Sequence, residues 1–250
     1  PNVMHVARLN TLMNGAQFTD LKIMDSLAPL ASITGNGTKG LPVNPGFYQG
    51  GLTLIITNPP FGAKVTDQRV LDDFASRDGV GKANGKVSKS LPQEVAFVNR
   101  CLEFLAPGGR MGIVLPDGVL ANDSMQYIRD WILRWARIKA VVSLPQETFA
   151  PYGAGVKTSV LFLEKREKPL KDGIEPEIWK KHDYSFGADG KVSESVRETP
   201  AIKDYSVFLA LVEDIGYDAT GRLTIPEEHA SLPPQVAETI ADFRKKLGWA

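Results

Sequence analysis

Three short apolar runs in the middle of the chain predict buried strands. They are residues 52–57 (LTLIIT), 110–116 (RMGIVLP) and 138–145 (IKAVVSLP). Each run has the length of a strand and is rich in branched apolar residues. Residues 52–57 are apolar at both alternating positions, so we expect a central parallel strand covered by helices on both faces.

Apolar residues at helical spacing separate these runs and predict two helices. The first begins with a capping box formed by Ser90 and Gln93, and Pro92 lies in its tolerant first turn. The second helix covers residues 124–137. The apolar stripe of the first helix and the turn that ends it are Val95, Val98, Leu102, Leu105 and Pro107-Gly108-Gly109.

Weaker patterns flank this central part. Residues 3–13 have helical spacing, and Asn14-Gly15 is a stop signal. Residues 20–27 (DLKIMDSL) predict a short strand that ends at Asp25. Residues 156–165 alternate less cleanly and end in charges, which predicts a strand at or near an edge of the sheet.

Strands and helices therefore alternate, which predicts an α/β sheet with right-handed crossover connections. Residues 28–50 and 62–90 are rich in glycine, proline and polar residues and predict connecting loops. We expect residues 1–165 to form the sheet domain and residues 166–250 to form a charged connector with a helical tail. The tail helices are expected at residues 204–216 and 233–248.

Composition and charge narrow the function further. Lys plus Arg and Asp plus Glu both number 29, so the formal net charge is zero, and contact with nucleic acid must come from a local patch or from partners. The single cysteine, Cys101, excludes an internal disulfide and suits a reducing compartment, so we expect a cytoplasmic protein. No apolar run has the length of a membrane span, and the first residues show no signal-peptide pattern, so we expect no contact with a membrane.

The strand at residues 52–57 runs directly into Asn58-Pro59-Pro60-Phe61. Ligands of open α/β sheets bind at the carboxyl ends of strands. The nitrogens of Pro59 and Pro60 carry no hydrogen, so the turn offers acceptors, to which Asn58 adds its amide oxygen. Two acceptors suit a planar NH₂ group, and Phe61 offers a stacking face for a flat ring. The motif therefore predicts a pocket for an aromatic exocyclic amine.

This motif and its surroundings resemble the modification subunits of type I restriction-modification systems, which are adenine-N6 DNA methyltransferases. The family's motif is (Asn/Asp/Ser)-Pro-Pro-aromatic, and further similar segments are ARLNTLMNGA, IMDSL, FVNRCLEFLAPGGRMGIVLPDGVLAND, LPQETFAPYGAGVKTSVLFLEK and VFLALVEDIGYDATGRL. The resemblance implies a class I, Rossmann-like methyltransferase sheet and S-adenosylmethionine as the cofactor. It also implies double-stranded DNA with a flipped adenine as the substrate, and a specificity subunit and a restriction subunit as partners. Methyl transfer is then a direct displacement without a covalent intermediate, and we expect no metal site.

The resemblance assigns roles to individual residues. Asn58 and the carbonyl of Pro59 would hold the target N6, and Pro60 and Phe61 complete the catalytic motif, with Phe61 stacking on the flipped base. The cofactor would be contacted by Asn58 and by Asp25 with Ser26. The alternative for Asp25-Ser26 is a local cap of the next turn.

A further set of residues is expected near the target base or the DNA backbone. They are Phe149, Tyr152 and Lys157, in the segment that resembles the family's last hairpin, and Lys82, Lys86 and Lys89, in a loop without acidic residues. The alternatives are core packing for Phe149 and a plain solvated loop for the three lysines.

One part of the family's pattern is missing. Neither the glycine-rich cofactor turn nor the acidic residue for the ribose is found. The family's strand order is 3-2-1-4-5-7-6, in which residues 20–25 would be strand 3 and residues 52–57 strand 4. Without strands 1 and 2, residues 52–57 would have an unpaired apolar edge. We therefore expect the chain to be the C-terminal part of a longer subunit, or to be completed by another chain, and to bind S-adenosylmethionine poorly alone.

Two other functions remain open. A methyltransferase with this motif could act on RNA or on a protein glutamine, but such chains are compact around the motif, and the long loop at 62–90 favours the DNA enzyme. A non-catalytic scaffold that binds DNA or a specificity subunit is the second alternative. The intact Asn58–Phe61 motif argues against decay of the whole protein, but the scaffold alternative stays open for the present chain, which we expect to be inactive on its own.

Overall fold

The computed structural model describes residues 2–15, 21, 24–34, 49–76, 82–83, 86–170, 177–186, 192–201, 205–222 and 224. The helices are α1 Asn2–Met13, α2 Leu30–Thr34, α3 Gln68–Ser76, α4 Gln93–Phe104, α5 Asp117–Ala121 and α6 Gln126–Trp135, with the 3-10 turns η1 Asp123–Met125 and η2 Ala150–Tyr152. The strands are β1 Leu52–Thr57, β2 Lys64–Val65, β3 Lys82–Ala83, β4 Lys86–Val87, β5 Leu91–Pro92, β6 Leu105–Pro116, β7 Ala136–Ser143, β8 Thr158–Lys165, β9 Glu177–Phe186, β10 Val192–Ala201 and β11 Phe208–Leu211.

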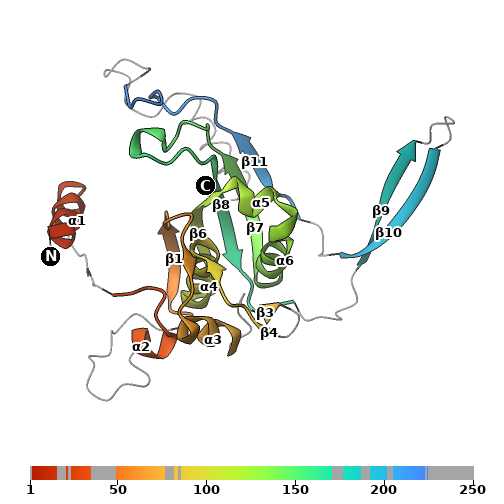
Figure 1. Ribbon diagram of the computed structural model, residues 1–250, viewed down its shortest axis with the longest axis horizontal. Helices are drawn as coiled ribbons and strands as arrows, with labels where there is room; N and C mark the ends of the chain where they lie inside the picture. The colour runs from red at the N-terminus through yellow and green to blue at the C-terminus, as the bar shows by residue number, and fades with distance from the viewer. Residues whose placement is uncertain are drawn as a thin grey trace.

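A mixed five-stranded sheet of order β1-β6-β8-β7-β11 forms the body of the protein (Figure 1). β1 is parallel to β6, β11 is parallel to β7, and β8 is antiparallel to both β6 and β7. The carboxyl ends of β1, β6, β7 and β11 therefore share one edge of the sheet with the start of β8. The order β1-β6-β8-β7 matches strands 4-5-7-6 of the expected methyltransferase order, which confirms the α/β prediction.

Helices α3, α4 and α6 pack on one face of this sheet. Met111, Ile113 and Leu115 alternate along β6 and are at most 1% exposed, so all three point to that face. Leu161 and Leu163 of β8 belong to the same core. The helices complete the core with Val70, Leu71, Phe74, Val95, Val98, Leu102, Ile128 and Ile132. The apolar stripe predicted for α4 is confirmed.

β1 is an edge strand among the described residues. Ile55 packs against the core, whereas Leu54 and Ile56 on the opposite face are 59% and 80% exposed. The prediction that residues 52–57 are covered on both faces is therefore wrong. The prediction of an unpaired apolar edge is confirmed, because the described part of the sheet supplies β6 as the partner of β1 and no other.

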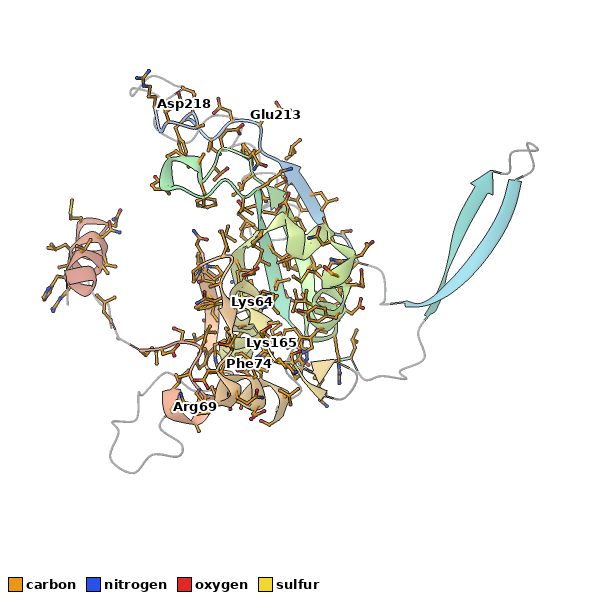
Figure 2. The ribbon with its side chains drawn as sticks, viewed as in Figure 1. Lys64, Arg69, Phe74, Lys165, Glu213 and Asp218 are labelled. Atoms are coloured by element: carbon orange, nitrogen blue, oxygen red, sulfur yellow. The ribbon has the colours of Figure 1, made fainter. Side chains whose placement is uncertain are left out.

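Helix α3 lies within the segment expected to be a loop. Asp67 caps its start, because the Asp67 carboxylate accepts the backbone N–H of Arg69 at 2.9 Å. Val70 and Phe74 face the core, while Arg69 lies on the surface (Figure 2). Capping and a short apolar stripe thus suffice to form a helix in a polar stretch.

The start of α4 differs from the predicted capping box. The helix begins at Gln93, and Ser90 precedes the short strand β5 instead of capping the helix. The backbone N–H of Gln93 donates to the carbonyl of Ala63 at 2.9 Å, so the preceding loop satisfies this helix end.

Two predictions for the later part of the sheet are wrong, one on the position of a strand and one on a helix. β8 lies in the interior of the sheet and not at or near its edge, because both β6 and β7 pair with it. Residues 208–211, expected to be helical, form β11 and extend the sheet beyond β7. β9 and β10 pair with each other as an antiparallel ribbon in the expected connector. The helix expected at residues 233–248 lies outside the described residues.

Arg100 on α4 fastens the segment before α2 to the core. Its side chain is 1% exposed, and Nη2 donates to the carbonyls of Leu27 and Ala28 at 3.2 and 2.7 Å. Asp73 and Glu103 supply carboxylates at 3.3 and 2.7 Å. Loss of this cation would leave two largely buried carboxylates without their compensating charge.

None of the helices in the described part of the chain is both long and apolar enough to cross a membrane.

Candidate active site

The Asn58–Phe61 motif follows β1 at the edge where the parallel strands end. Asn58 and Pro60 are exposed, whereas Pro59 is buried and anchors the turn. Gly62 has a φ of +83°, which a side chain would disfavour, so the chain can turn sharply after the motif. The motif therefore presents the Asn58 amide to solvent from a fixed strand end.

Phe61 and Phe149 lie close together at this edge. Their ring centroids are 6.4 Å apart and their planes meet at 75°, an edge-to-face contact. Both rings are half-buried, so neither is absorbed into the core. The structure thus brings together two aromatic residues that the sequence predicted for the target pocket.

The loop that carries Phe149 is held by hydrogen bonds at its base and at its middle. The backbone N–H of Leu144 donates to the carbonyl of Thr158 at 3.0 Å. The hydroxyl of Tyr217 donates to the carbonyl of Thr148 at 2.8 Å, so the segment after β11 braces the loop. Tyr152, by contrast, is 78% exposed.

Lys157 is held by an acidic residue at the end of the neighbouring strand. Its Nζ lies 3.5 Å from Oδ2 of Asp117, which directly follows β6. Ser159 donates its hydroxyl to Oδ1 of the same carboxylate at 2.7 Å. Asp117 was not among the residues expected from sequence, although like Asn58 it is a polar residue that directly follows a strand.

The Asp25–Ser26 turn lies at the other end of β1. The Asp25 carboxylate accepts the N–H of Leu27 at 3.0 Å, the local cap considered as an alternative. The flanking segment packs beside Leu52, and Asn58 lies about 20 Å further along the strand at 3.3 Å per residue. The described residues 21, 24 and 25 form no strand. The structure does not bring Asp25 to the Asn58 corner, and contact of Asp25 and Ser26 with the cofactor stays a prediction.

The three predicted phosphate-binding lysines are also apart from this corner. Lys82 and Lys86 lie in the β3–β4 hairpin, which Figure 1 shows beside α3, and Lys89 follows it as an exposed residue. Their contact with DNA stays a prediction.

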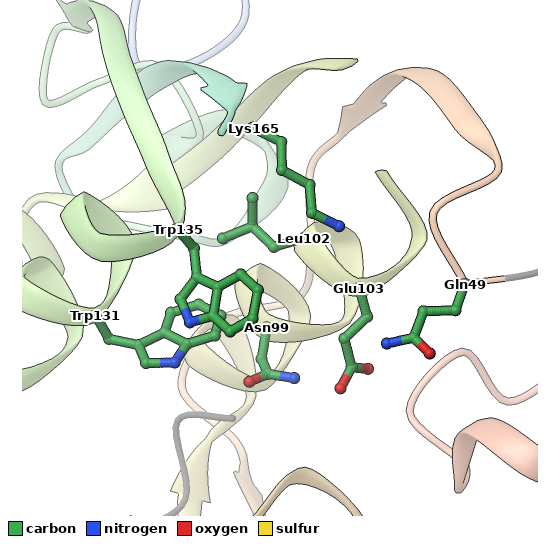
Figure 3. A pocket seen from close by; sticks show the side chains of 7 residues that line it. All are labelled: Gln49, Asn99, Leu102, Glu103, Trp131, Trp135 and Lys165. Atoms are coloured by element: carbon green, nitrogen blue, oxygen red, sulfur yellow. The ribbon is translucent and has the colours of Figure 1, made fainter. Parts of the chain in front are cut away.

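A pocket between α4 and α6 lies at the edge of the sheet opposite Asn58 (Figure 3). It is lined by Gln49, Asn99, Leu102, Glu103, Trp131, Trp135 and Lys165. The Nζ of Lys165 donates to the carbonyl of Leu105 at 2.6 Å, and burial lowers the pKa of this amine, although the carboxylate of Glu103 opposes the shift. Figure 2 shows Lys165 and Phe74 toward one end of the sheet and Glu213 and Asp218 beyond the other. Leu105, which Lys165 contacts, is paired with Leu52 at the start of β1, so the pocket lies at the opposite end of this strand from Asn58.

Comparison with known proteins identifies the family. The family model described as N-6 DNA Methylase matches residues 1–185. The chain is 31% identical over 136 residues to the methylase subunit of the type I restriction enzyme EcoEI of Escherichia coli, which covers 54% of this chain. It is 31% identical over 113 residues to the EcoKI methylase subunit of Escherichia coli strain K12, which covers 45% of this chain. The crystal structure of the EcoKI M protein superimposes with a TM-score of 0.41 at 23% identity, over 66% of this chain and 29% of that one.

The fold and the strand-end motif define a class I methyltransferase sheet. The chain belongs to the N-6 DNA methylase family. It matches 24% of the length of the EcoEI methylase subunit and 18% of the EcoKI subunit.

Proposed function

We propose that this chain forms part of an adenine-specific DNA methyltransferase that transfers a methyl group from S-adenosylmethionine to N6 of a flipped adenine. The observation that carries the proposal is the corner at the end of β1. There a buried Pro59 fixes the turn, Asn58 is exposed, and Phe61 lies beside Phe149.

The chemistry of the corner suits an exocyclic amine. The Asn58 side-chain oxygen and the Pro59 carbonyl accept the two N6 hydrogens, and Phe61 stacks on the base. Holding both hydrogens favours a pyramidal nitrogen whose lone pair is free to attack. S-adenosylmethionine supplies an electrophilic methyl group. Transfer would form the N–C bond and break the bond between the methyl carbon and the sulfur of the donor, and the amine would release one proton to solvent.

Of the residues expected to contact the cofactor, Asn58 is exposed at the end of β1, which supports a role beside the amine. Asp25 and Ser26 lie at the start of β1 in this structure, so no step of the reaction is assigned to them.

The proposed setting is a type I restriction-modification assembly in the cytoplasm, with a specificity subunit and a restriction subunit. The matches to two type I methylase subunits support it. Zero net charge also supports it, because a chain without a basic excess needs partners for tight and selective DNA binding.

Transfer of labelled methyl groups tests the substrate. The active assembly is incubated with labelled S-adenosylmethionine and, separately, with DNA, RNA or a protein that contains accessible glutamines. Label is expected in DNA alone. Asn58→Ala should abolish transfer and leave assembly intact, because it removes one acceptor without changing a buried residue. Label in RNA or protein, or full activity of the Asn58→Ala variant, would refute the proposal.

A further inference from the structure

Asp117 lies at the same carboxyl edge of the sheet as the catalytic motif. Thr57 of β1 is in register with Ile113 of β6, and both strands run in the same direction. β1 ends at Thr57 and β6 ends at Pro116, so Asn58 and Asp117 each directly follow the carboxyl end of their strand. Asp117 is therefore one strand away from the proposed target pocket.

Lys157 and Ser159, at the start of β8, contact the Asp117 carboxylate, and Lys157 also contacts the Asp117 backbone. Oδ1 accepts the hydroxyl of Ser159 at 2.7 Å, and Ser159 itself is 3% exposed. Oδ2 lies 3.5 Å from Nζ of Lys157. The backbone N–H of Asp117 donates to the carbonyl of Lys157 at 3.0 Å. The carboxylate thus has one orientation, and in that orientation it holds the Lys157 ammonium.

This ion pair contributes little to the stability of the fold. The side chains of Lys157 and Asp117 are 43% and 31% exposed, and ion pairs at such positions add little because water screens them. A carboxylate at a DNA-facing edge also repels phosphates. Its presence there is better explained by its effect on Lys157.

We propose that Asp117 is a positioning residue of the active site. Ser159 holds the Asp117 carboxylate, and Asp117 orients Lys157 so that the lysine receives a backbone phosphate beside the target adenine. The inference rests on the proposed function. It adds Asp117 and Ser159 to the residues expected from sequence, and it assigns Lys157 a phosphate and not a base as its ligand. The anion shares the ammonium with Asp117 when DNA is bound.

A double-mutant cycle in the active assembly tests the inference. Asp117→Asn keeps the shape of the side chain and a partner for Ser159, but removes the charge that holds Lys157. Its kcat should fall about 10- to 100-fold, as expected for a misplaced substrate contact. Its DNA dissociation constant should stay equal or become lower, because one negative charge is lost from the interface.

Lys157→Met should lower kcat by a similar factor, weaken DNA binding, and reduce the salt dependence of binding by about one released counterion. The double variant Asp117→Asn/Lys157→Met should be no slower than Lys157→Met alone, because Asp117 acts through Lys157. The matched control is Glu164→Gln at the other end of β8. Glu164 is 26% exposed and lies 3.5 and 3.6 Å from Arg137 and Lys139, so its loss should leave kcat unchanged.

Three outcomes would overturn the inference. In the first, the double variant has a kcat lowered by the product of the two single effects. In the others, Asp117→Asn has the wild-type kcat, or Glu164→Gln lowers kcat as much as Asp117→Asn does. A weaker DNA affinity of Asp117→Asn would also overturn it, since a purely structural role predicts that result. These outcomes leave the proposed function intact if the wild-type assembly methylates DNA. A wild-type assembly that transfers no methyl group to DNA would overturn both.

Discussion

Phe61 is the residue at which stacking can be separated from hydrogen bonding to the amine. Its ring is half-buried and touches Phe149 edge to face, so one face can receive a base. Phe61→Ala should lower kcat/KM for DNA by about 5- to 150-fold, the equivalent of about 1–3 kcal/mol of base stacking. Phe61→Tyr keeps the ring and should retain most of the activity. Equal activity of the Ala and Tyr variants, measured by methyl transfer to DNA, would show that the ring does not stack on the target.

Cys101 is a second residue with a measurable consequence. Burial on α4 raises the pKa of its thiol to about 12, against a weaker opposing effect of the Arg100 charge. At pH 8 the folded protein should therefore react with a maleimide far more slowly than the urea-unfolded chain. The pH dependence has a definite sign. Above pH 9 the unfolded thiol ionises while the folded one stays protonated, so the free energy of unfolding should fall as the pH rises toward 12. Rapid maleimide labelling of Cys101 in the native protein at pH 8 would contradict the raised pKa of this thiol.

Asn58, Pro59 and Phe61 could be predicted as a site from sequence because their residue types themselves supply acceptors and a stacking face. Asp117 could not be singled out in this way, because the role proposed for it depends on Lys157 and Ser159, which are about 40 positions away along the chain and meet it through strand pairing.

Among the elements, α3 depends on one large buried side chain. Phe74 is fully buried, and the Arg100 guanidinium lies 4.7 Å from its ring centroid. Phe74→Ala should lower the free energy of unfolding by about 3–5 kcal/mol, since it opens a cavity in the core. Arg69→Ala on the exposed face of the same helix should change it little. Urea denaturation followed by circular dichroism measures both. Equal effects of the two changes would mean that α3 is not packed as described.

Helices and strands were predicted correctly where the local sequence pattern determines them, and wrongly where pairing with distant strands does. The strands β1, β6 and β7 and the helices α4 and α6 were found, because their apolar patterns are long enough to identify them. β11 was predicted as a helix, since a short apolar run fits both periods, and its conformation is decided by pairing with β7. The charged end of β8, Glu164-Lys165, suggested an edge strand. Its interior position is instead decided by pairing with β6 and β7, which the local sequence does not show.

At the scale of the whole molecule, the described residues do not bring the predicted cofactor-binding residues to one place. The turn of Asp25 lies at the start of β1 and Asn58 at its end. Isothermal titration of the 250-residue chain with S-adenosylmethionine should therefore show weak binding or none. Sub-micromolar binding would contradict this prediction and would mean that the chain forms a complete cofactor site.

The molecule as a whole is proposed to methylate N6 of adenine, and the product shows this most directly. DNA treated with the active assembly and S-adenosylmethionine is digested to nucleosides and measured by mass spectrometry, with an Asn58→Ala assembly as the control. We expect N6-methyldeoxyadenosine with the wild-type assembly and none with the variant. Methylated cytosine, no methylated nucleoside at all, or N6-methyldeoxyadenosine formed equally by the variant would contradict the proposed role of the corner at the end of β1.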